Sequence, residues 1–181
     1  MNETEFSLTR AMERLWTDHV VWTRQYVIAA VDERPEVETA AARLLKNQED
    51  IGGAIVPFYG AEAGGQLTDL LKQHIMIAVD LVASAKAGDK ENFALHDKRW
   101  DDNAADIARF LSGANPNWPE KAVVDLLSVH LALTKDEVVA RLEGDYAKDA
   151  ETFDQILTEI LTLADALSEG IIKQFPEKFA A

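Results

Sequence analysis

The spacing of apolar residues along the chain predicts an all-α protein. Apolar side chains recur at intervals of three and four residues through nearly the whole sequence, and no stretch alternates apolar and polar positions over a useful length. Short stretches rich in proline, glycine and aspartate, which end or begin helices, interrupt this pattern. The breaks are Glu33 to Pro35, Pro57 to Gly65, Gly88 to Asp89, Gly113 to Pro119 and Gly144 to Asp145. We therefore expect an up-down bundle of about six helices.

Comparison of the chain with itself indicates an internal repeat. An offset of 56 residues carries His74 onto His130, and the Gly-Asp pair at Gly88 onto the pair at Gly144. His19 has a similar place in the first pair of helices. Any two amphipathic helices have similar apolar patterns at an offset of whole heptads, and 56 residues are eight heptads. The shared turn and histidine nevertheless favour a true repeat. We expect one domain over 1–181, built from three related αα-hairpins at about 5–56, 65–112 and 119–175.

Each predicted hairpin has one histidine on the apolar stripe of its first helix and one polar residue on that of its second. Residues equally far from the turn of an antiparallel hairpin lie level with each other. The level pairs are His19 with Asn47, His74 with Asn103, and His130 with Glu159. If the hairpins pack about one axis, the three histidines and Glu159 form a ligand set typical of zinc, iron or manganese.

Other polar residues would support this site or form a second one. Asn47 and Asn103 would orient the histidines next to them. Thr23 and Thr134 follow His19 and His130 by one helical turn, where a hydroxyl orients an imidazole or a bound water, or bonds its own helix backbone. About 10 Å nearer the turns, at 1.5 Å rise per residue, a second site is conceivable. Its residues are Tyr26, His96 and Glu137.

The same pattern has other readings, which the sequence leaves open. Buried imidazoles and amides that bond to each other fix helix register without any ligand, in a non-catalytic structural or interaction protein. Such a protein would form a homodimer through the surface around Trp22 or Trp118. A pocket for a small organic ligand between the hairpins is a third reading. Neither metal motif of helical proteins, Glu-x-x-His or His-Glu-x-x-His, is present, and the sequence does not decide whether the protein is an enzyme.

Composition narrows the classes of function and of partner. The 181 residues include no cysteine, so histidines and carboxylates must supply any metal ligands. A net charge of −14 repels nucleic acid and anionic membranes, and neither is an expected partner. The polar, acidic N-terminus does not resemble a secretory signal, and no apolar run reaches the roughly 18 residues of a spanning helix. We expect an acidic, cytoplasmic protein.

Three segments resemble a family of small, uncharacterised all-helical proteins from Gram-positive bacteria. These segments are Leu15 to Arg24, Asn47 to Gly52 and Gly170 to Pro176. The resemblance spans nearly the whole chain and implies a complete helical protein. Members are sometimes labelled acetylglutamate kinase or glycosyltransferase, but this sequence has neither a glycine-rich phosphate loop nor the strand pattern of an α/β fold. The resemblance therefore implies a fold and no function.

Overall fold

The computed structural model describes residues 2–180, and the described chain is all helical apart from short connections. Five α-helices and one short 3₁₀ helix account for it. They are α1 (Glu3–Val31), α2 (Val37–Ala87), α3 (Lys90–Ala114), α4 (Glu120–Glu143), α5 (Tyr146–Gln174) and η1 (Pro176–Lys178). The all-α prediction is confirmed.

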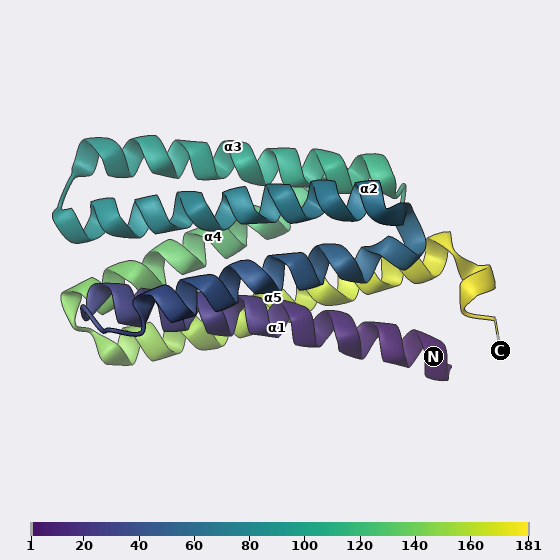
Figure 1. The fold of residues 1–181 in the computed structure, drawn as a ribbon, viewed down its shortest axis with the longest axis horizontal. Helices are drawn as coiled ribbons and strands as arrows, with labels where there is room; N and C mark the ends of the chain where they lie inside the picture. Colours follow the sequence, from purple (N-terminus) through teal and green to yellow (C-terminus); the bar gives the residue numbers. More distant parts are fainter. Residues whose placement is uncertain (1, 181) are drawn as a thin grey trace.

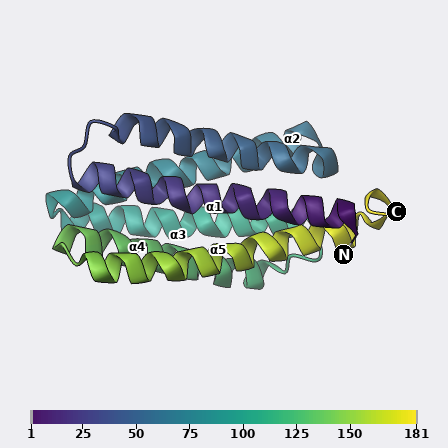
Figure 2. The ribbon, with the colours of Figure 1, turned by 90° about the horizontal axis from the view of Figure 1, so that it is seen from below.

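The helices lie roughly along one axis and form an elongated bundle (Figures 1 and 2). Consecutive helices pack against each other, and α5 packs back against α1, so that the bundle closes. Helix α4 also contacts α1 and α2, which brings these three helices together inside the bundle. No helix of the described chain is both long and apolar enough to cross a membrane.

The prediction of six helices in three hairpins is not matched, because the break expected from Pro57 to Gly65 is not a loop. Helix α2 continues through this stretch and bends back on itself at Gly60, the one residue inside it with non-helical angles (φ 86°, ψ 167°; Figure 1). Pro57 lacks an N–H and weakens the helix one turn before the bend, and a positive φ suits glycine, which has no Cβ. A single residue thus replaces the expected loop.

The two Gly-Asp pairs lie between helices, as predicted. Gly88 and Gly144 end α2 and α4 in the left-handed conformation, with φ of 66° and 73°. The aspartate after each glycine caps the next helix, since the Asp89 side chain accepts from the Asn92 N–H and the Asp145 side chain from the Lys148 N–H. These local signals therefore set where α3 and α5 begin.

The two halves of α2 approach closely on either side of the bend. A Cβ added to Gly52 would lie 2.5 Å from the carbonyl oxygen of Gly64, whereas a Cβ on Gly53 would meet nothing within 4 Å. We expect Gly52→Ala to lower the free energy of unfolding by about 1–3 kcal/mol, because the helices must separate. Gly53→Ala, its neighbour and control, should raise it by up to about 1 kcal/mol through helix propensity. Urea unfolding of both variants measures the difference, and equal effects would contradict a close contact at Gly52.

The core consists of two apolar clusters with the histidines near their boundary. On α1, His19 lies between Trp16 of the larger cluster and Tyr26 of the smaller one. On α4, His130 lies between Leu127 of the larger cluster and Val138 of the smaller one. Helices α1 and α4 thus present their histidines where the apolar packing changes from one cluster to the other.

Trp118 does not lie on a surface, which contradicts the idea of a dimer contact there. It is 4% exposed, its indole N–H donates to the Ala166 carbonyl at 3.2 Å, and its ring packs over Gly170. Trp22 is half-buried beneath the Arg43 guanidinium, 5.4 Å from the ring centre. Trp118 therefore holds the α3–α4 connection against α5.

Candidate metal centre

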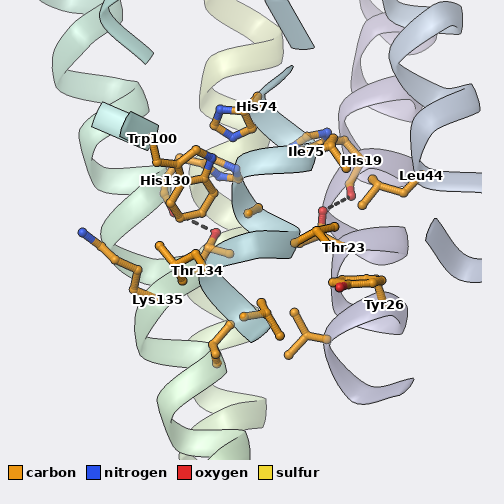
Figure 3. Close-up of a pocket in the computed structure, with 16 residues that line it drawn as sticks. His19, Thr23, Tyr26, Leu44, His74, Ile75, Trp100, His130, Thr134 and Lys135 are labelled. Atoms are coloured by element: carbon orange, nitrogen blue, oxygen red, sulfur yellow. Dashed lines mark hydrogen bonds between the residues drawn. The ribbon is translucent and has the colours of Figure 1, made fainter. Parts of the chain in front are cut away.

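Three histidines from three helices meet inside the bundle. His19 of α1, His74 of α2 and His130 of α4 each offer a ring nitrogen, and these nitrogens lie within 4.8 Å of one another. The side chains are 2–3% exposed, and the ring centres are 5.5–6.3 Å apart. Figure 3 shows the three imidazoles at one end of a pocket. The convergence expected for these histidines is what the structure has.

His74 is oriented by the amide of Asn103, its expected neighbour on α3. The histidine Nδ1 lies 2.9 Å from Asn103 Oδ1, and Asn103 Nδ2 donates to the Leu70 carbonyl at 3.1 Å. Because Leu70 engages the amide nitrogen, the oxygen of Asn103 faces the ring and accepts from Nδ1–H. His74 Nε2 therefore carries a free lone pair.

Glu159 lies behind His130 rather than beside the other two histidines. Its Oε2 is 3.1 Å from His130 Nδ1, and it does not belong to the group of converging ligand atoms. A carboxylate accepts from Nδ1–H, so the neutral tautomer that pairs with Glu159 has its lone pair on Nε2. Glu159, which the sequence predicted as the fourth ligand, is therefore placed to orient His130 instead. Its Oε1 has no hydrogen-bond partner.

The first histidine lacks the hydrogen bond to Asn47 that the sequence predicted for it. Asn47 donates to the Leu15 carbonyl at 3.0 Å, but its Oδ1 accepts from Gln48 rather than from His19. His19 Nδ1 and Gln48 Oε1 are both buried without a partner, and the Gln48 side chain acts on the pKa of His19. Gln48, which is fully buried, is therefore the residue beside His19 that corresponds to Asn103 beside His74 and to Glu159 beside His130. The signal available in the sequence was a second amide residue directly after Asn47.

Burial keeps the imidazoles of His19 and His74 neutral near pH 7. Desolvation, followed by the proximity of the other histidines, lowers the pKa of His19 well below its ordinary value of 6.5. The same causes lower the pKa of His74 to about 3. A neutral imidazole is the form that ligates metal ions.

A small cavity adjoins the histidines and has mainly aliphatic walls. Its volume of about 20 Å³ admits roughly one water molecule. Thr23 and Thr134 line it, as Figure 3 shows, and each donates its hydroxyl proton to the carbonyl of the histidine one turn earlier, at 2.8 and 2.9 Å. These bonds to their own helix backbone are one of the two expected roles. Because each hydroxyl proton is already used, only the oxygen lone pairs of the two threonines can form a further hydrogen bond.

The residues of the conceivable second site have different partners. Tyr26 is buried and lines the same cavity. His96 is half-buried on α3, with its Nδ1 3.3 Å from an Arg99 nitrogen. Glu137, 1% exposed, forms an ion pair with Arg24. No ligand group among the described residues joins His96 to Glu137.

An ion cluster beside α5 was missed by the sequence reasoning. Arg24 contacts both carboxylate oxygens of Asp149, at 2.6 and 3.0 Å, as well as Glu137. Arg141 links Asp149, at 3.5 Å, to Asp32. Burial raises the pKa of Glu137 to about 7, although Arg24 opposes this shift. The cluster connects α1, α4 and α5.

Comparison with protein-family models, with curated proteins and with solved structures finds no match. The resemblance to small helical proteins of Gram-positive bacteria therefore stays a prediction. The function is inferred from the geometry of the chain itself.

Proposed function

We propose that this protein binds a divalent transition metal ion, such as zinc, iron or manganese, through His19, His74 and His130. The observation that carries the proposal is the convergence of three buried ring nitrogens, from three helices, within 4.8 Å. A tetrahedral ion with metal–nitrogen bonds of about 2.0–2.1 Å holds its ligands roughly 3.4 Å apart. Small rotations of the imidazoles would close the remaining distance.

The hydrogen bonds behind the histidines support the same proposal. Metal-bound histidines commonly donate their other N–H to a carboxylate or carbonyl oxygen, which fixes the tautomer. Asn103 and Glu159 accept in this way from His74 and His130. On ion binding, a small shift would let Gln48 Oε1 accept from His19. Both atoms would then gain the partner that they lack.

The hydrogen bonds of Asn47 and Asn103 also favour the internal repeat. Asn47 donates to Leu15 and Asn103 to Leu70, and each acceptor carbonyl lies four residues before a histidine. The same amide thus bridges equivalent helices in the first two units, and Glu159 replaces it in the third. We infer that three related hairpins, the second beginning at the bend of α2, supply one ligand each.

Three histidines leave an open coordination position, which is the arrangement of catalytic rather than structural zinc sites. An ion there would act as a Lewis acid or activate a bound water, in hydrolytic or oxidative chemistry. The cavity beside the histidines is where such a ligand would lie. The competing proposal is a layer that fixes helix register without an ion, and it is favoured by the hydrogen bonds that Asn103 makes to both His74 and Leu70, which do not require an ion.

His19→Leu separates the two proposals. Because His19 Nδ1 has no hydrogen-bond partner, leucine leaves no additional polar group stranded. We expect wild-type protein purified without tag or chelator to contain about one transition metal ion per chain by elemental mass spectrometry. His19→Leu should lose most of it and remain folded, because two histidines bind far more weakly than three.

His96→Ala is the matched control, since His96 is the one histidine outside the cluster. It should retain the metal content of the wild type. A metal-free wild type whose melting temperature does not respond to added zinc, iron or manganese would refute the proposed function and leave the register layer.

A further inference from the structure

The cavity beside the histidines limits what an ion held there can bind. About 20 Å³ is free, and the walls toward Tyr26 are formed by aliphatic side chains of α1, α2 and α4 (Figure 3). This space admits roughly one water-sized group. A ligand from solvent is therefore small and slim, and a bulky substrate cannot reach the ion without opening the bundle.

The charges around the cavity decide the sign of that ligand. Three neutral imidazoles leave the full charge of a divalent ion in a buried site, and Glu159 behind His130 compensates one unit of it. Lys135 is the one ionic side chain among the described residues that line the cavity, and Asp97 neutralises it at 2.7 Å. Glu137 is close enough to interact electrostatically with His130, but its charge is neutralised by Arg24. One positive charge remains uncompensated in an apolar environment, where it is costly.

We infer that the ligand completing the site is a small monoanion, of which hydroxide is the simplest example. This inference rests on the proposed function and goes further, because it selects an anion over a neutral molecule of the same shape. A dianion would leave the site with a net negative charge. It also gives Glu159 a role beyond positioning His130: the carboxylate limits how tightly the anion binds.

The test uses the full chain loaded with Co²⁺, whose visible absorption reports its ligands. Azide and acetonitrile are both slim and linear, and each contacts a metal ion through one nitrogen atom, but only azide is charged. Both are three heavy atoms long and exceed the free space equally, so a difference between them reports charge and not size. We expect azide to change the cobalt spectrum saturably, whereas acetonitrile at equal concentration leaves it unchanged. Glu159→Gln retains an oxygen that accepts from His130 and removes the charge. It should bind azide about tenfold or more tightly than the wild type.

Glu169→Gln makes the same charge change at an exposed position of α5, where Glu169 pairs with Lys173, and should bind azide as the wild type does. Acetonitrile binding as well as azide would overturn the inference, and so would a cobalt spectrum that neither azide nor fluoride, a monoanion of the size of water, alters. So would an unchanged azide affinity in Glu159→Gln that still holds one cobalt ion. Failure to bind cobalt at all would instead refute the proposed function, so the two failures are distinguishable.

Discussion

Arg24→Met is expected to lower the free energy of unfolding by about 3–5 kcal/mol, the largest effect of any single substitution considered for this protein. Arg24 neutralises two carboxylates that are almost fully buried, Glu137 and Asp149, which are 1% and 2% exposed. Methionine retains most of the packing of the side chain but leaves these carboxylates without their main partner. Arg141 lies 3.5 Å from Asp149 and cannot replace the bidentate contact that Arg24 makes with this carboxylate.

Urea unfolding at neutral pH measures this effect. Arg24→Lys should fall between the wild type and Arg24→Met, because an ammonium group retains the charge but not the paired contacts of a guanidinium. Arg14→Met removes an exposed ion pair with Asp18 and should change stability by less than about 1 kcal/mol. A loss below about 1 kcal/mol for Arg24→Met would mean that water enters the cluster and solvates its carboxylates.

The metal-free protein is expected to lose stability steeply as the pH falls below 6.5. The unfolded chain protonates His19 and His74 near pH 6.5, whereas the folded chain does not, since burial lowers their pKa values. Their contribution is thus fully present above pH 6.5 and is lost toward pH 3, at about 1.4 kcal/mol per pH unit for each histidine. Glu137 opposes this loss between pH 7 and 4.5, because its pKa is raised to about 7 in the folded chain.

The net loss should therefore be about 1.4 kcal/mol per pH unit between pH 6 and 5. Urea unfolding with excess chelator, at a series of pH values, measures this slope. His19→Leu should flatten it almost to zero, and Glu137→Gln should roughly double it. A wild-type slope of zero or of the opposite sign would show that the histidines are already protonated, or exposed to water, in the folded protein.

The fold class, the Gly-Asp turns and the inward direction of the three histidines could be predicted from the sequence. Each of these depends on local physics. A periodicity of three and four predicts helices, and a histidine on an apolar stripe faces the core whatever the stripe packs against. Gly88 and Asp89 act through backbone angles and a hydrogen bond to a residue three positions away. Each of these signals depends only on residues that lie within a few positions of one another along the chain.

The bend of α2 and the hydrogen-bond partners of the histidines depend on how the helices pack against each other. Pro57 and Gly60 indicate that the helix is interrupted, but only packing of the two halves at Gly52 and Gly64 makes a single residue sufficient for the reversal. Equal distance from a turn correctly paired His74 with Asn103. It could not show that Gln48, rather than Asn47, faces His19, because that depends on how far a helix is rotated about its axis.

The placement of Glu159 and the ion cluster were also beyond the sequence. Two residues at the same level of neighbouring helices can both point to the centre of the bundle, or one can lie behind the other, farther from the centre. The sequence does not distinguish these arrangements. Glu159 lies behind His130. Arg24 meets Glu137 and Asp149 across 113 and 125 residues of sequence. Partners so distant are chosen by which helix faces meet, since a charge on one helix gives no indication of the charge that will neutralise it.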